Sequence, residues 1–311
     1  MCSGIGLNCP IPLRLLIKLK NRMKKRNVIL AFALIGIVNA SAQTVDFSKF
    51  QKSAESDSIA KVVLENSQYL IIYDYEYVRD AEFPEDKRSG MTMLQVGKRY
   101  NRFMDYNEFR FDSLMDATAK SLKPYAETGP MMMQALKKRK FRENIVIDKQ
   151  KSTETIQRTA GLVQRYQYDE PCPTLNWELV EGDTVIASYN CKKALTSLWG
   201  RDYIAWYAPE VDMPYGPYKF NGLPGLIFMV ADTRGHHQFT LNGLEKVSQY
   251  YPIYLWASKD IIKTSRNKVR KIYKNYCADP VGALTSNGDI QVPDDVKASV
   301  SVKPYNPIEL E

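Results

Sequence analysis

Apolar and polar residues alternate along many short stretches of the chain, which is the pattern of β-strands that bury one face. The strongest alternation predicts a strand from Ser67 to Arg79, in which Tyr69, Ile71, Tyr73, Tyr75 and Tyr77 share one side. Further strands are expected at 91–96, 99–105, 144–148, 154–159, 162–168, 193–199, 202–208, 228–232, 237–241 and 245–255, and as a hairpin around Glu181-Gly182-Asp183 that joins 176–180 to 184–189.

Helical spacing of apolar residues predicts helices at 109–126 and 258–276, and a short helix is expected at 58–64. The 258–276 segment carries Lys and Arg opposite its apolar stripe. That basic face is either a solvated surface or a peripheral contact with anionic membrane headgroups, and both interpretations stay open.

Short strands without intervening βαβ helices favour an antiparallel sheet. We therefore expect a mainly β (α+β) fold, a curved antiparallel sheet or incompletely closed barrel with a few packed helices. This shape is similar to that of periplasmic lipoprotein-carrier folds, and a likeness of fold does not by itself assign a function.

The beginning of the chain has the pattern of an export signal. Met23-Lys24-Lys25-Arg26 precedes a short apolar run and the small residues Ala40-Ser41-Ala42, which predicts a signal peptide with residues 1–22 as an over-extended start. We expect the domains to be 1–42 as this leader, 43–279 as one β-rich domain and 280–311 as an extended tail. Export to the periplasm, or to a position associated with the outer membrane, follows from the leader.

The leader also accounts for the basic composition. Seven of the 43 Lys and Arg residues and none of the 35 acidic residues lie within 1–42, so residues 43–311 carry 36 basic and 35 acidic side chains. Nucleic acid is therefore not expected as a partner.

An apolar turn at Gly222-Leu223-Pro224-Gly225-Leu226-Ile227 stands out, because its glycines and proline forbid a helix. This hexapeptide is identical to the signature of the GLPGLI family, secreted bacterial proteins of unknown function, and the chain resembles that family over most of its length. Further resemblance lies at 94–98, 189–194, 200–207, 216–220 and 306–310.

The candidate chemistry is sparse. His236 and His237 are adjacent and would point to opposite faces of a strand, and no nucleophile elbow, phosphate loop or zinc-ligand spacing is present. Met131-Met132-Met133 is interpreted as core packing rather than a metal or heme site. We expect no cofactor and no metal. Cys172 and Cys191 flank the predicted hairpin around Gly182 and could lie within disulfide reach, which leaves Cys277 as an odd thiol.

Arg201 follows Gly200 in a stretch rich in aromatic residues. Its guanidinium can stack on an aromatic ring, pair with a buried carboxylate or hold an anionic ligand. The candidate residues for binding a ligand or partner come from this strand and the apolar turn, and they are Arg201, Tyr203, Trp206, Tyr218, Phe220, Leu223, Pro224 and Leu226.

These features favour a binding or carrier protein for an apolar or amphipathic ligand, held between sheet and helices. The alternative is an interaction module that docks on an outer-membrane protein, and a hydrolase with scattered carboxylates is a third hypothesis. A concave apolar cavity of some hundreds of Å³ would favour the first, and an exposed apolar patch over a filled core would favour the second.

Overall fold

The computed structural model describes residues 58–121, 125–160, 164–285 and 301–311. These residues are mainly β-strand with few helices, as predicted. The predicted signal peptide lies outside the described residues.

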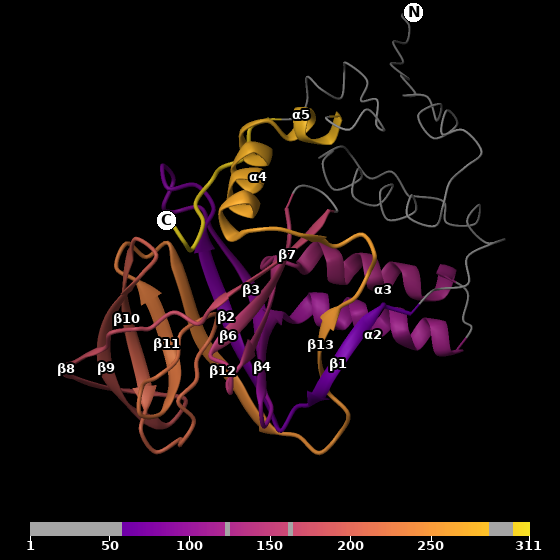
Figure 1. Ribbon diagram of the computed structural model, residues 1–311. Coiled ribbons are helices and arrows are strands. Elements are labelled where there is room, and N and C mark those ends of the chain that lie inside the picture. The colour runs from indigo at the N-terminus through magenta and orange to yellow at the C-terminus, as the bar shows by residue number, and fades with distance from the viewer. Residues whose placement is uncertain (1–57, 122–124, 161–163, 286–300) are drawn as a thin grey trace, which may run out of the picture. The chain divides into compact units, whose positions relative to one another are not determined.

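One large sheet dominates the described residues (Figure 1). Its strand order is β14-β7-β6-β5-β4-β3-β2-β12-β11-β10-β9-β8, and every neighbouring pair is antiparallel except β14 and β7. Since β14 and β8 remain as edges, the curved sheet is open and does not close into a barrel. The strands are β2 (Tyr69–Val78), β3 (Lys87–Val96), β4 (Tyr100–Asp105), β5 (Glu143–Asp148), β6 (Thr153–Thr159), β7 (Arg165–Pro171), β8 (Glu178–Ile186), β9 (Tyr189–Leu198), β10 (Arg201–Ala208), β11 (Leu226–Asp232), β12 (His237–Lys246) and β14 (Ile262–Lys263).

A second, two-stranded sheet pairs β1 (Lys61–Asn66) with β13 (Pro252–Trp256). The described helices are α2 (Tyr106–Ser121), α3 (Tyr125–Lys138), α4 (Arg266–Ala278) and α5 (Pro280–Thr285). Helices α2 and α3 lie side by side in Figure 1 and are in contact.

The two sides of the large sheet differ. On the side that we call the core face, Ile71, Tyr73 and Tyr75 of β2 join an extensive aromatic and aliphatic core, which α4 also contacts through Val269. On the opposite side, which we call the helix face, Leu70, Ile72 and their neighbours face α2. A smaller cluster of Met104, Tyr254 and Trp256 packs there.

Several expectations from the sequence are confirmed. The strand at 67–79 is β2, the hairpin at 91–105 is β3–β4, and Thr233-Arg234-Gly235 joins β11 to β12. The helix expected at 109–126 exists as α2, although it begins three residues earlier, at Tyr106.

Other expectations are wrong. Residues 61–66 form β1 instead of part of a helix, because they pair with β13. The turn of the β8–β9 hairpin is Ala187-Ser188, both with positive φ, whereas Gly182 lies inside β8 where the register shifts. A long strand at 245–255 does not form, since β12 ends at Lys246 and β13 begins at Pro252. The helix expected at 258–276 begins only at Arg266.

The C-terminal segment 301–311 has no regular secondary structure but reaches the core. Ile308 and Glu309 are buried, and the Leu310 amide donates to the Trp199 carbonyl oxygen over 2.8 Å. This segment is thus part of the packed protein rather than a solvated tail.

Candidate ligand-binding pocket

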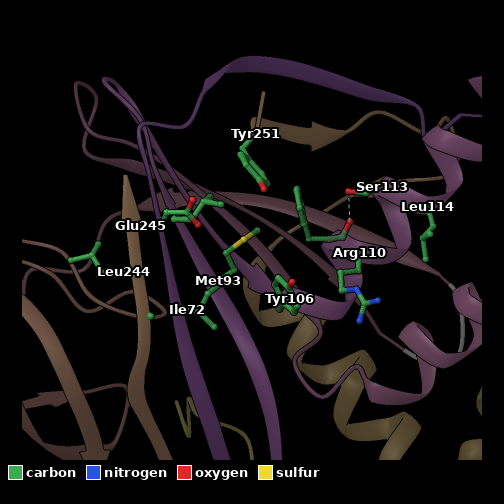
Figure 2. Close-up of a pocket in the computed structure, with 12 residues that line it drawn as sticks. Ile72, Met93, Tyr106, Arg110, Ser113, Leu114, Leu244, Glu245 and Tyr251 are labelled. Carbon is green, nitrogen blue, oxygen red and sulfur yellow. Dashed lines mark hydrogen bonds between the residues drawn. The ribbon is translucent and has the colours of Figure 1, made fainter. Parts of the chain in front are cut away.

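A pocket of about 610 Å³ opens on the helix face, between α2 and the sheet (Figure 2). Its volume lies in the range of sites for small molecules. It is lined by Leu70, Ile72, Met93, Tyr106, Phe109, Arg110, Ser113, Leu114, Gly243, Leu244, Glu245 and Tyr251.

Helix α2 supplies one wall of this pocket. Tyr106, Phe109, Arg110, Ser113 and Leu114 follow the spacing of a single helical stripe, so they face the same space. Among them only Arg110 and Ser113 are not aromatic or aliphatic.

Polar contacts fix the orientation of α2. Asp105 caps its first turn, because one carboxylate oxygen accepts the amides of Asn107 (2.7 Å) and Glu108 (3.3 Å). Asp112 then accepts hydrogen bonds from the Tyr254 hydroxyl and the Trp256 indole, each over 2.7 Å. Burial raises the pKa of Asp112. The buried side of α2 is therefore polar, which leaves the neighbouring stripe for the pocket.

The sheet supplies the opposite wall. Leu70 of β2 and Met93 of β3 are buried, and Ile72 of β2 is half-buried. Gly243 lies beside a register shift in β12, and a Cβ atom added there would meet nothing within 4 Å. The absence of a side chain at Gly243 thus keeps part of the pocket open.

Two charged residues line the pocket, Arg110 from α2 and Glu245 from β12. They lie on opposite sides of it in Figure 2. Within the described part of the chain, neither side chain makes a hydrogen bond or an ion pair.

The site residues predicted from the sequence lie elsewhere, mostly in the interior of the core face. Tyr203, Tyr218, Phe220, Leu223 and Leu226 are each at most 2% exposed. Trp206 is half-buried, and Pro224 is exposed. The apolar turn and the Arg201 strand do not line the pocket, so they do not form its mouth.

The GLPGLI turn has a structural explanation. Gly225 has φ 146°, and a side chain there would collide with the Ala208 carbonyl oxygen. Gly222 has φ 90°, and the Trp177 indole donates to the carbonyl oxygen of the preceding Asn221 over 2.8 Å. Glycine is required at these positions so that Leu223 and Leu226 can be buried.

Arg201 is a structural residue in the same interior. Its guanidinium forms an ion pair with Asp232 (2.7 Å) and donates to the carbonyl oxygens of Pro307 (2.8 Å) and Ile308 (3.1 Å). The neighbouring Tyr203 hydroxyl also donates to the Ile308 carbonyl, over 3.2 Å. Of the options open from the sequence, the buried ion pair is the one that forms.

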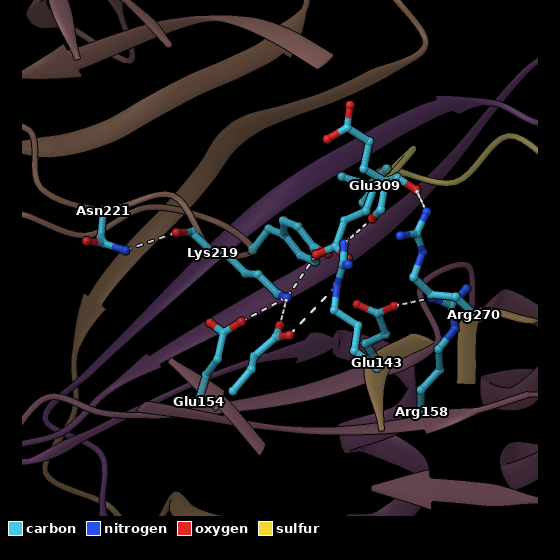
Figure 3. Close-up of polar contacts among 12 residues, drawn as sticks. Glu143, Glu154, Arg158, Lys219, Asn221, Arg270 and Glu309 are labelled. Atoms are coloured by element: carbon cyan, nitrogen blue, oxygen red, sulfur yellow. Dashed lines mark hydrogen bonds and ion pairs between the residues drawn. The ribbon is translucent and has the colours of Figure 1, made fainter. Parts of the chain in front are cut away.

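A second group of buried charges surrounds Lys219, three residues before the apolar turn (Figure 3). Its ammonium nitrogen lies 2.8 Å from Glu154, 2.5 Å from Glu170 and 2.8 Å from Glu309. Arg266 of α4 pairs with Glu309 over 2.8 Å, and Tyr218 donates to the same carboxylate over 2.5 Å. We call Lys219 with its three glutamates the Lys219 cluster.

The carboxyl groups of the Lys219 cluster differ in protonation. Burial raises the pKa of Glu154 to about 8, and apart from the contact with Lys219 neither of its oxygens accepts a hydrogen bond from the described residues. Burial alone would raise the pKa of Glu309 too, but Lys219 and Arg266 outweigh it and hold that pKa below its ordinary value. At neutral pH Glu154 is therefore protonated and Glu309 ionised. No periodic pattern in the sequence indicates this cluster, because its members come from β6, β7, the turn and the C-terminal segment.

The cysteines, histidines and methionines singled out in the sequence lie outside the pocket. Cys172, Cys191 and Cys277 are free thiols, so the predicted Cys172–Cys191 disulfide is not formed. The predicted hairpin around Gly182 does not exist, and Cys191 of β9 lies opposite Thr184 of β8.

His237 is buried against the Tyr75 hydroxyl (2.9 Å), and His236 Nδ1 lies 3.3 Å from Arg201. Met132 is buried whereas Met131 is half-exposed, so these two methionines diverge.

Helix α4 keeps its basic surface but not a free apolar face. Val269, Tyr276 and Cys277 are buried, while Lys268, Lys271 and Lys274 are exposed. A membrane contact of α4 would therefore rest on charge rather than on insertion of apolar side chains.

No helix within the described ranges is long and apolar enough to cross a membrane. The same residues contain no group of three or more His, Cys, Asp or Glu side chains placed to hold a metal ion.

No protein-family model and no curated protein matches the chain. Among solved structures, PNGF-II in space group C2 gives a TM-score of 0.44 at 13% identity, over 66% of this chain and 32% of that one. PNGF-II in space group P21 gives 0.42 at 11%, over 67% and 33%. An uncharacterised conserved protein from Thermus thermophilus gives 0.31 at 11%, over 64% and 91%. The chain thus matches about a third of the length of PNGF-II.

Proposed function

We propose that this protein binds or carries an apolar or amphipathic ligand in the pocket between α2 and the large sheet. Export to the periplasm or outer membrane and membership of the GLPGLI family belong to the same proposal, supported by the leader pattern and the hexapeptide. The single observation that carries the proposal is the pocket of about 610 Å³ with walls that are mostly aliphatic and aromatic.

The composition of the walls indicates the kind of ligand. Ile72 of the sheet faces Phe109 and Leu114 of α2 across the pocket, and all three side chains are half-buried. Apolar surface that stays in contact with water is unfavourable by about 25 cal/mol per Å² relative to burial. An apolar ligand that covers these side chains gains this free energy, and no covalent chemistry is needed.

Filling the pocket tests the proposal. Gly243 has an ordinary backbone conformation and open space around its missing side chain, so Gly243→Phe is expected to fold and to occupy the pocket. Gly243→Ala is the matched control, because it adds only one methyl group at the same position.

The measurement is a fluorescence titration with the neutral apolar probe N-phenyl-1-naphthylamine, together with the urea midpoint of each variant. We expect the wild type and Gly243→Ala to bind alike and Gly243→Phe to bind at least about tenfold more weakly, which corresponds to about 1.4 kcal/mol. Equal binding by Gly243→Phe at an unchanged urea midpoint, or no binding by the wild type, would contradict the proposal.

One observation favours the alternative of a protein-docking module. The edge strand β8 exposes Leu179 and Val185, at 59% and 66%. An exposed edge with apolar side chains can pair with a strand of another protein. Leu179→Lys with Val185→Lys would abolish such docking and leave probe binding in the pocket unchanged, which separates the two functions in a pull-down and titration on the same variant.

A further inference from the structure

The charge of Arg110 points to the chemistry of the ligand. We infer that the pocket takes an anionic amphiphile, whose apolar chain lies against the sheet and whose carboxylate, or an equivalent oxyanion, binds the guanidinium of Arg110. This inference rests on the proposed function of the pocket and adds the charge and the orientation of the ligand.

Arg110 lacks the partner that comparable arginines have. In the described ranges nine arginines are buried or half-buried, and they are Arg99, Arg102, Arg110, Arg139, Arg158, Arg165, Arg201, Arg266 and Arg270. Eight of them donate to a carboxylate, an amide oxygen or a carbonyl oxygen. The Arg110 side chain makes no hydrogen bond, ion pair or ring contact with the rest of the described protein.

The position of Arg110 also favours an anionic ligand. It lies in the middle of the α2 stripe, one turn before Leu114 and next to Phe109, both of which line the pocket. A cation held beside apolar side chains loses part of its hydration, and an oxyanion that binds it there restores the lost interaction. The guanidinium presents a planar pair of donors that fits a carboxylate or phosphate.

Glu245 fixes the direction in which the ligand lies. It lines the side of the pocket formed by β12, and its negative charge disfavours a second anion there. The apolar chain then lies against Ile72 of the sheet, while the oxyanion stays at α2. A single-chain carboxylate satisfies both ends, whereas a free inorganic anion leaves the apolar wall uncovered.

The test compares two ligands of equal chain length, dodecanoate and dodecanol, by displacement of N-phenyl-1-naphthylamine from the full protein. The variants are Arg110→Ala, the charge reversal Arg110→Glu, and Lys120→Ala as a control for an exposed cation at the far end of α2. Alanine and glutamate both favour helix, so α2 is expected to stay folded, and circular dichroism checks this.

We expect the wild type and Lys120→Ala to bind dodecanoate about tenfold or more tightly than dodecanol, since hydrogen bonds between two charged groups are stronger than those to a neutral hydroxyl. In Arg110→Ala this preference disappears through weaker binding of dodecanoate, while dodecanol binds as before. In Arg110→Glu dodecylammonium is expected to bind more tightly than dodecanoate.

The outcomes separate this inference from the proposed function. Equal binding of dodecanoate and dodecanol by the wild type, or an unchanged preference in both Arg110 variants, would overturn the inference and leave an apolar carrier in place. A wild type that binds none of these ligands, nor the neutral probe, would overturn both. Dodecanoate binding that survives Gly243→Phe would show that the anion binds outside the pocket and would overturn the inference alone.

Discussion

Arg201 and Lys219 on the core face differ from Arg110 on the helix face in whether the chain supplies their partners. On the core face, Arg201 and Lys219 are almost completely buried, and each is surrounded by acceptors. On the helix face, Arg110 is half-buried beside an open apolar pocket and has no partner within the described protein. The chain itself supplies the acceptors for Arg201 and Lys219, whereas a bound ligand would supply the acceptor for Arg110.

The C-terminal segment accounts for much of this difference. Its carbonyl oxygens accept hydrogen bonds from Arg201, and its Glu309 forms ion pairs with Lys219 and Arg266. The C-terminal segment thus supplies the partners of these three cations. No segment in the described ranges plays that part for Arg110. Buried charges therefore indicate function in this protein only where the chain does not provide their partners.

The largest effect is expected from Lys219. Lys219→Met removes the ammonium group from Glu170 and Glu309 in the interior, and removal of one partner from a buried ion pair destabilises a protein by about 3–5 kcal/mol. Lys268→Met on the exposed side of α4 is the control and should change the free energy of unfolding by less than about 0.5 kcal/mol. Urea unfolding measures both, and similar midpoints for the two variants would mean that the Lys219 cluster does not stabilise the core face.

A smaller and more selective effect distinguishes two glutamates of the cluster. Glu309→Gln removes an ionised carboxylate from Lys219 and Arg266 and should destabilise by about 1.5–3 kcal/mol at pH 7. Glu154→Gln replaces a carboxyl group that is already protonated, so its effect at pH 7 should stay within about 1 kcal/mol. Urea unfolding at pH 7 measures both variants, and equal losses of stability would contradict the contrast.

The protonation of Glu154 also predicts how the stability of the protein changes with pH. Between the ordinary pKa of 4.5 and the native pKa of about 8, native Glu154 keeps a proton that the unfolded chain has lost. The Glu154 carboxyl group therefore makes stability fall as the pH rises through this window. In Glu154→Gln that loss disappears, so urea unfolding should show the variant gaining stability relative to the wild type as the pH rises from 4.5 to 8. A constant difference over this window would contradict these protonation states.

The sequence predicted one face better than the other. The alternation of apolar and polar residues correctly predicted β2, because Tyr73 and Tyr75 face a core of aromatic and aliphatic side chains. Helical spacing predicted the helix α2 itself, but its apolar residues are not the ones that are buried. The structure buries Glu108 and Asp112 instead, because Arg139, Arg165, Tyr254 and Trp256 lie opposite them.

The candidate site was missed for a related reason. Aromatic density around Arg201 and the glycines at 222 and 225 drew attention to the core face, where they shape a turn and hold the C-terminal segment. The signal for the pocket was weaker but present, because Tyr106, Phe109, Arg110, Ser113 and Leu114 form a stripe that contains a single charge. Gly243 could not have been recognised, since its importance depends on which strand and which helix lie across from it.

Native mass spectrometry of the protein purified from its own cell envelope, beside the same protein after denaturation and refolding, detects a bound ligand directly. Ligand binding in the pocket predicts a co-purifying small molecule with an apolar chain and an acidic group, absent after refolding and absent from Gly243→Phe. A bare protein mass in all three samples, with the native protein held in complexes through β8, would contradict it.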